Sequence, residues 1–216
     1  EFYDSDKLFP AYGFGGRPAQ GQPTAHCFAI NRNEQAPQVH PVQGISGVLQ
    51  SYFSSLQWVQ LHGPTLFHPV IQRAHVLAQQ AAMEGSQKYY VLLIITDGMN
   101  NDMQQTIDAI VKASALPLSI LIVGVGQADF SNMHVLDADN GRLSTPGDGV
   151  NGPMTASRDI VQFVEIAPFL SKGTGAYEAP LARELLAEIP AQFLGYMKSI
   201  GKPPPDPINV TIPTDL

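Results

Sequence analysis

The sequence contains one cysteine and one tryptophan, and charged residues make up only 14% of its 216 residues. A single cysteine, Cys27, excludes an internal disulfide and any zinc site built from several thiolates. It also fits a reducing compartment, so we expect an intracellular protein. No run approaches the roughly 20 apolar residues that a membrane-spanning helix needs. The chain does not open with a charged and then apolar stretch, so we expect no secretory leader.

Positive charge is also scarce. The formal net charge is -7 and the pI is about 5.2. We find no local basic patch, so no general attraction to nucleic acid or to anionic lipid is available. We therefore expect no nucleic-acid partner.

Apolar residues are plentiful, at 44% of the chain, which is enough for one domain with a sizeable core. Hydrophobic patterns alternate between strands and helices, which is typical of a doubly wound α/β fold with a mostly parallel open sheet flanked by helices. We place this domain at residues 1–200 and a Pro-rich tail or linker at 201–216. The strands are expected at 8–14, 26–30, 89–96, 118–125 and 159–166, and the helices at 44–61, 69–83, 103–114, 130–136 and 179–200, the last interrupted by Pro190.

The strand before Asp97 shows no polar alternation from Val91 to Ile95. We therefore expect it to be covered on both faces, as parallel strands are. Ligands of open α/β sheets bind beyond the carboxyl ends of the strands, where Asp97 and Gly98 stand. The alternative is that Asp97 caps the helix that follows, as Asn and Asp residues often do. The strand alone does not decide between them.

Motifs for catalysis are absent. Gly124-Val-Gly126 lacks the third glycine of a dinucleotide loop, and there is neither a phosphate-binding loop with Gly-Lys-Ser/Thr nor a nucleophile elbow. His62 and His68 flank Thr65, but two prolines prevent a shared helical face, and surface histidines are the commoner case. Trp58 is expected to pack at a helix edge rather than to form a binding platform. We expect no enzyme.

Two oxygen donors remain as candidates. Thr65 stands in a Gly-Pro-Thr turn and Asp97 at a strand end, and hydroxyl and carboxylate groups are ligands that magnesium, manganese or calcium prefer. Mg²⁺ needs about six oxygens, so these two groups alone hold it poorly.

Several segments together resemble the von Willebrand factor A-type domain of the copine family, in order and in spacing. They cover most of the chain: Asp4-Ser-Asp-Lys-Leu-Phe-Pro-Ala-Tyr-Gly-Phe-Gly15, Gly63-Pro-Thr65, Val91-Leu-Leu-Ile-Ile-Thr-Asp-Gly98, Ala109-Ile-Val-Lys-Ala113, Leu116-Pro-Leu-Ser-Ile120, Val123-Gly-Val-Gly126, Arg158-Asp-Ile-Val-Gln-Phe-Val164 and Leu185-Leu-Ala-Glu-Ile-Pro190.

The resemblance implies a protein-interaction module with a metal-ion-dependent adhesion site. In it, Thr65 is the ligand of the second loop and Asp97 that of the third. The family's first strand and first loop, a D-x-S-x-S-like motif, have no match here, so we expect a chain truncated at its amino end, with a partial site that binds a divalent cation weakly or not at all. Losing that central strand leaves sheet edges unpaired, which invites aggregation.

The resemblance also has implications for the longer protein to which such a module belongs. Copines join this module to calcium-dependent phospholipid-binding domains, which are not in this chain. It therefore implies protein partners for this module, a membrane contact made only by those other domains with their calcium, and a cytoplasmic protein peripheral to the plasma membrane.

Two alternatives stay open. Plant-type ubiquitin ligases carry a similar A-type domain, but they end in a cysteine-rich RING, whereas no cysteine follows Cys27 here. The other is a structural remnant with neither a metal nor a partner.

Overall fold

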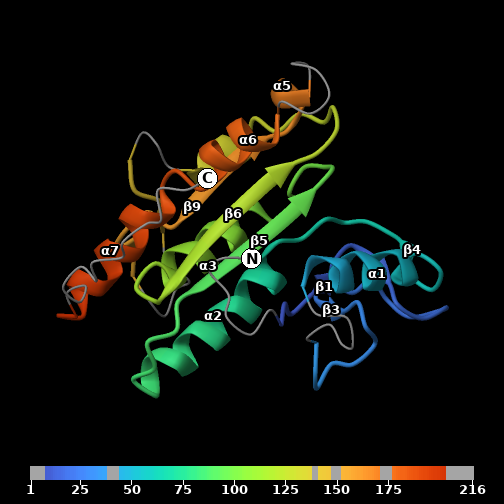
Figure 1. The fold of residues 1–216 in the computed structure, drawn as a ribbon, viewed down its shortest axis with the longest axis horizontal. Helices are drawn as coiled ribbons and strands as arrows, with labels where there is room; N and C mark the ends of the chain where they lie inside the picture. Colours follow the sequence, from blue (N-terminus) through green and yellow to red (C-terminus); the bar gives the residue numbers. More distant parts are fainter. Residues whose placement is uncertain (1–7, 38–43, 138–140, 147–151, 171–176, 203–216) are drawn as a thin grey trace, which may run out of the picture.

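Three parallel strands form the central sheet of the protein. The computed structural model describes residues 8–37, 44–137, 141–146, 152–170 and 177–202. The strands lie in the order β5-β6-β9, with bounds Tyr90–Thr96, Leu118–Gly124 and Val161–Glu165. Helices flank this sheet (Figure 1), so the predicted α/β class is confirmed.

The helices lie close to their predicted positions. Their bounds are Ile45–Ser55 (α1), His68–Met83 (α2), Met103–Ala113 (α3), Met133–Asp137 (α4), Ala167–Leu170 (α5), Glu178–Leu185 (α6) and Ile189–Ser199 (α7). Pro190 was expected to interrupt one long helix, and it stands in the first turn of α7. Proline is well placed there, because the first turn does not use its missing N–H.

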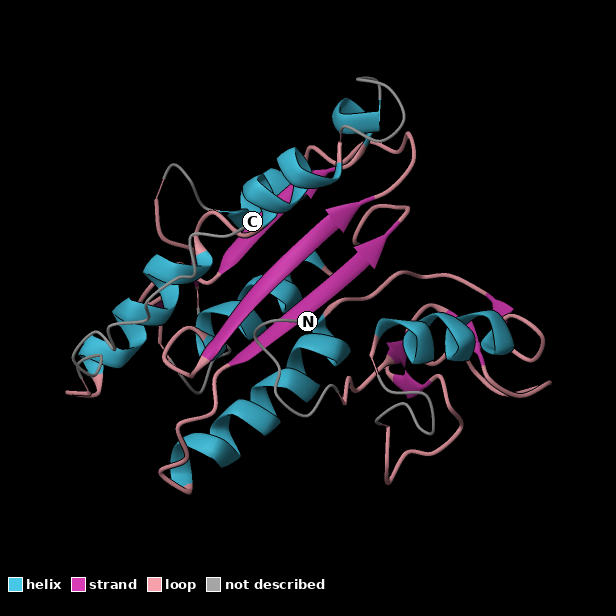
Figure 2. Ribbon diagram, in the orientation of Figure 1, coloured by secondary structure: helices cyan, strands magenta, loops and turns pink. Residues whose placement is uncertain are grey.

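The remaining strands are two residues long and form antiparallel pairs. β1 (Tyr12–Gly13) pairs with β3 (Phe28–Ala29), β2 (Gly16–Arg17) with β4 (Gln60–Leu61), and β7 (Ser144–Thr145) with β8 (Met154–Thr155). The first four strands and α1 form a lobe beside the sheet (Figure 2). The predicted strand 8–14 thus shrinks to β1, and the predicted helix 44–61 ends early.

A close approach explains part of this lobe. A Cβ atom on Gly13 would lie 2.5 Å from the ring of Phe28, which is 7% exposed. Only glycine lets the β1 backbone come so near that ring. The side chain of Phe28 therefore fills the lobe's small core.

The main core lies between the sheet and the pair α2 and α3. Ile94, Ile120 and Ile122 point from the strands into it and are at most 2% exposed. Ile71 of α2 and Ile110 of α3 meet them there. Every residue of β6 is buried, as its unbroken apolar run predicted.

The other face of β5 differs from the expectation that this strand is covered on both sides. Val91, Leu93 and Ile95 are 49%, 51% and 59% exposed. They pair in register with alternate residues of β6 on the face against which α7 packs. In the described part of the chain, α7 covers β6 but not β5, and no strand pairs with the outer edge of β5. Among the described residues, β5 is thus an edge strand with one open face.

Polar contacts around Arg158 hold α7 on the sheet. Its guanidinium donates to the carbonyl of Leu118 at 2.8 Å, the hydroxyl of Tyr89 at 3.1 Å and the carbonyl of Gln192 at 3.1 Å. The side chain of Gln192 in turn accepts from the Ser119 hydroxyl at 2.5 Å. This network fixes α7 over the start of β6.

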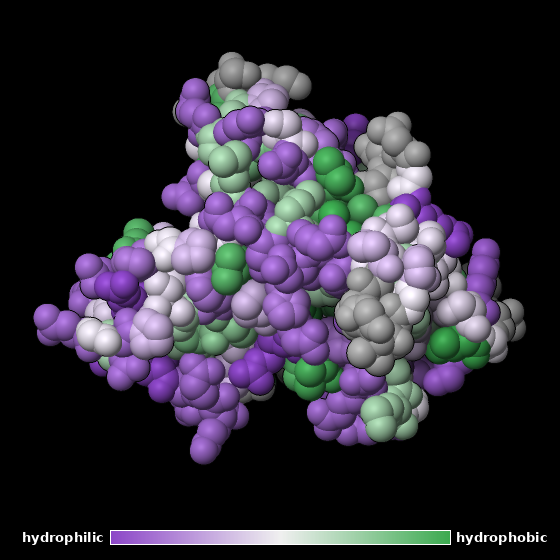
Figure 3. Space-filling view, turned by 180° about the vertical axis from the view of Figure 1, so that it is seen from behind, coloured by the Kyte–Doolittle hydropathy of each residue, from purple (hydrophilic) through white to green (hydrophobic). Residues whose placement is uncertain are grey.

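The reverse side of the molecule presents mainly hydrophilic side chains, with hydrophobic ones in separate small patches (Figure 3). No helix in the described ranges is long and apolar enough to cross a membrane.

The apolar edge of β5 predicts self-association of this chain. Uncharged, unpaired edge strands template pairing with other chains, and a lysine on the strand opposes it. We expect Leu93→Lys to lower the concentration-dependent mass of the purified chain in sedimentation velocity. The matched control is Val76→Lys on α2, which is 48% exposed and lies off the edge. Equal behaviour of both variants would contradict a role for the edge.

Candidate functional site

The loops that carry Thr65 and Asp97 lie side by side at the carboxyl end of the sheet. Asp97 follows the last residue of β5, and Thr65 lies between β4 and α2. Asn101 joins the two loops, because its side-chain oxygen accepts from the Thr65 N–H at 2.8 Å and its own N–H donates to the Thr65 carbonyl at 2.9 Å. The structure therefore brings the two predicted loops together.

Asp102 links the same loops through buried contacts. Its carboxylate is buried, at 7% exposed, and accepts from the N–H groups of Phe67 and His68 at 2.9 Å each. The hydroxyl of Thr106 donates to it at 3.0 Å. Although Asp102 is the N-cap residue of α3, its side chain caps α2, whose first N–H groups have no partner within that helix.

This position decides one alternative left open by the sequence. The residue at the N-cap position of α3 is Asp102, so the interpretation of Asp97 as that helix's cap is wrong. Asp97 is instead exposed at the strand end. Its neighbourhood in the loop leaves its carboxylate accessible to a ligand.

The inner part of the loop is fully hydrogen-bonded. The Asn100 side chain accepts from the Asp102 N–H at 2.7 Å and donates to the Thr106 hydroxyl at 2.8 Å. The Thr96 hydroxyl donates to the Gly98 carbonyl at 3.2 Å. These bonds connect the residues of the loop to one another and to Thr106 of α3.

A divalent cation fits this arrangement only in part. Thr65 and Asp97 offer two oxygen donors, whereas the carboxylate of Asp102 already accepts three hydrogen bonds. Among the described residues, no group of three or more His, Cys, Asp or Glu side chains is placed to hold a metal ion. Since Mg²⁺ needs about six oxygens in near-octahedral order, these residues do not complete a site.

The histidines near Thr65 have other contacts. The ring of His62 bonds the Arg17 guanidinium at 2.8 Å and the Thr24 hydroxyl at 2.7 Å, which ties it to the β2 side of the lobe. His26 lies within electrostatic reach of Asp102. Burial lowers its pKa, and the charge of Asp102 partly opposes that shift.

Sequence reasoning identified the two candidate ligands but missed the residues that position them. The sequence interpretation considered a cap only at Asp97 and gave no role to Asn101 or Asp102. Both residues belong to a run of short polar residues between a strand and a helix. A run of this kind does not reveal which residues of another loop it contacts.

Known proteins are similar to this chain over most of its length. The family model described as Copine matches residues 1–205. Protein BONZAI 1 of Arabidopsis thaliana is 51% identical over 198 residues, which make up 92% of this chain and 32% of that protein. Copine-A of Dictyostelium discoideum is 45% identical, over 91% of this chain and 30% of its own. Nicotinic receptor-associated protein 1 of Caenorhabditis briggsae is 44% identical, over 94% and 32%. The chain thus spans about a third of the length of these curated relatives.

Removing the Asp102 carboxylate should destabilise the fold. In Asp102→Ala, the buried N–H of Phe67 loses its acceptor, and so do the N–H of His68 and the Thr106 hydroxyl. We expect the free energy of unfolding to fall by about 2–3 kcal/mol, as measured by urea denaturation followed by circular dichroism. The control Asp97→Ala, in the same loop but exposed, should stay within about 0.5 kcal/mol of the parent. A similar loss in both variants would contradict the assigned role.

The incomplete donor set predicts weak metal binding by this chain. Titration calorimetry with Mg²⁺, Mn²⁺ or Ca²⁺ should give no saturable binding at micromolar concentration, because two oxygens leave most of the coordination shell to water. Saturable micromolar binding that disappears in Asp97→Ala would show instead that further ligands complete the site.

Proposed function

Since this chain belongs to the copine family, we propose that it is the protein-interaction domain of a copine-like, calcium-dependent phospholipid-binding protein. The family resemblance inferred from the sequence is confirmed by these comparisons. In this proposal the domain binds protein partners through the paired loops of Thr65 and Asp97, and it catalyses no reaction.

The observation that carries the proposal is the joining of the two loops by Asn101. Two hydrogen bonds between Asn101 and Thr65 hold the loops together, and Asp97 stands exposed four residues earlier in the chain. A rigid, exposed carboxylate beside a hydroxyl-bearing loop suits recognition, because binding then costs little ordering. One relative is named as a nicotinic receptor-associated protein, which supports association with proteins as the function.

The remaining roles belong to the longer protein in this proposal. Its other domains bind phospholipid with calcium and bring it from the cytoplasm to the plasma membrane. The chain's net charge of -7 opposes a direct contact with anionic lipid. The adhesion site here is a partial one, which a divalent cation occupies weakly if at all.

Partner binding should depend on Asp97. We expect affinity capture from a cytosolic extract, followed by quantitative mass spectrometry, to retain a set of proteins on the parent chain that Asp97→Ala loses. The control is Glu184→Ala, which removes an exposed carboxylate from α6 and should retain the same set as the parent. If the parent and both variants retain identical proteins, the loops do not make the partner contact. That result would support the alternative of a structural remnant.

A further inference from the structure

An open hollow lies in the lobe beside the sheet, away from the residues of the paired loops. Its volume is about 390 Å³, within the range of sites that take small ligands or peptide side chains. Neither Thr65 nor Asp97 lines it. Its lining combines apolar and charged residues, namely Pro18, Phe28, Ala29, Arg32, Glu34 and Trp58.

One wall of the hollow is apolar and aromatic. Trp58 stands just beyond the end of α1, and the ring of the buried Phe28 meets its indole edge-on, with 6.1 Å between the ring centres. Pro18 adds an apolar ring to the same lining. Trp58 was expected to pack at a helix edge rather than to form a binding platform, but it lies beyond the end of α1 and borders an open space. Such a wall offers a flat surface to an apolar side chain.

Arg32 provides a cation over this wall. Its guanidinium carbon lies 4.5 Å from the centre of the Trp58 ring. Its φ of 61° lies in the left-handed region, which a residue with a Cβ enters only under strain. In the described residues, Arg32 is the only non-glycine residue with positive φ. Strained residues that the surrounding structure holds in place are concentrated at functional sites.

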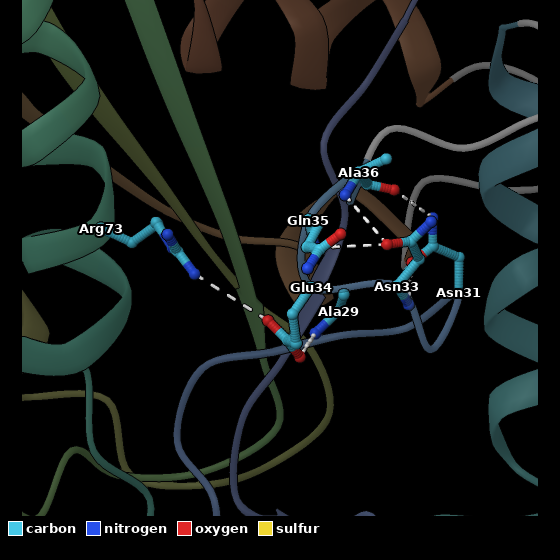
Figure 4. Close-up of polar contacts among 7 residues, drawn as sticks. All are labelled: Ala29, Asn31, Asn33, Glu34, Gln35, Ala36 and Arg73. Carbon is cyan, nitrogen blue, oxygen red and sulfur yellow. Dashed lines mark hydrogen bonds and ion pairs between the residues drawn. The ribbon is translucent and has the colours of Figure 1, made fainter.

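The turn around Arg32 is held by its neighbours (Figure 4). The Asn31 side chain accepts from the Asn33 N–H at 2.9 Å and donates to the Ala36 carbonyl at 2.8 Å. The Asn33 side chain accepts from the N–H groups of Gln35 and Ala36 at 3.2 Å and 3.1 Å. These bonds fix the backbone that presents Arg32.

Glu34 and Arg32 carry the two charges at the hollow, and they differ in whether they have a partner. The Glu34 carboxylate accepts from the Ala29 N–H at 2.6 Å and lies 3.9 Å from the Arg73 guanidinium (Figure 4). The Arg32 guanidinium, by contrast, has neither an acceptor nor a carboxylate partner in the part of the chain that the structure describes. A guanidinium stacked on a ring keeps its N–H groups free in its own plane. The Arg32 fork is therefore available to an anionic ligand.

We propose that this hollow binds an acidic peptide segment of a partner protein. A carboxylate of the segment pairs with both arms of the Arg32 fork, and a neighbouring apolar side chain packs against Trp58 and Pro18. A carboxylate suits the site better than a phosphate does, because the second charge of a phosphate would be repelled by Glu34, and a bare anion would leave the apolar wall uncovered. The proposal rests on the proposed protein-binding function, but it uses none of the residues of the paired loops.

The test begins with selection from a display library of random seven-residue peptides on the immobilised chain. We expect the enriched peptides to carry Asp or Glu next to an apolar residue. Their binding should change the fluorescence of Trp58, which is the only tryptophan of the chain and so reports on the hollow alone. Selection without an acidic motif, or binding without a change in that fluorescence, would overturn the proposal.

Variants then separate binding from folding. Arg32→Gly should weaken the selected peptides at least tenfold because it removes the fork. It should not lower the midpoint of thermal unfolding, because glycine adopts a φ of this sign without strain. Arg142→Gly, which removes an exposed arginine from another loop, is the matched control and should keep the parent's affinity. Unchanged affinity in Arg32→Gly would overturn the proposal.

Two further measurements distinguish the hollow from the paired loops and a peptide from a lipid surface. Asp97→Ala should bind the selected peptides as the parent does, so a failure of the paired loops in the capture experiment leaves this result intact. If Asp97→Ala abolishes peptide binding, the peptides occupy the paired loops and the hollow is not their site. If phosphatidylserine vesicles without calcium change Trp58 fluorescence and the peptides do not, the ligand is a lipid surface and the proposal is wrong.

Discussion

The carboxylate of Asp102 joins the turn before α2 to the loop after β5. A buried negative charge is costly unless hydrogen-bond donors surround it, and here the donors come from the first N–H groups of α2 and from the Thr106 hydroxyl in α3. The positive end of the α2 dipole adds to this stabilisation. The turn before α2 and the loop after β5 consequently lie against each other, and Asn101 completes their junction.

The two surfaces that we propose to bind partners differ in their chemistry. The paired loops expose a carboxylate and a hydroxyl, which are oxygen donors for a cation or for a cationic partner. The hollow beside Trp58 presents the opposite charge, a guanidinium on an aromatic ring. A domain that offers an anionic and a cationic site on separate elements has the means to orient a protein partner rather than only to hold it. Charge complementarity of this kind determines specificity more than it determines affinity.

The fold was largely predictable from local patterns, and the site was predictable in part. The apolar run of β6, the alternating pattern of β9 and the helical spacing of α2 and α3 identify those elements, because the spacing of apolar residues along the chain follows the secondary structure. Thr65 and Asp97 were identified as oxygen donors in a turn and at a strand end, and the family resemblance then implied their roles, whereas Asn101 and Asp102 were not identified. The open face of β5 was also missed, because an unbroken apolar run looks the same whether one or both of its faces are covered. Arg32 carried no sequence signal, since the sign of its φ depends on the bonds of Asn31 and Asn33.

By itself, the sequence determined the α/β class, the family and the strand end at which Asp97 stands. Tertiary structure alone decided the roles of two aspartates in one short loop. Asp97 is exposed at the strand end, whereas Asp102 is buried and caps a helix whose first residues lie 35 and 34 positions earlier in the chain. The reason is physical, because the state of a carboxylate depends on the donors that surround it. For Asp102, two of those donors come from a distant segment that only folding brings near.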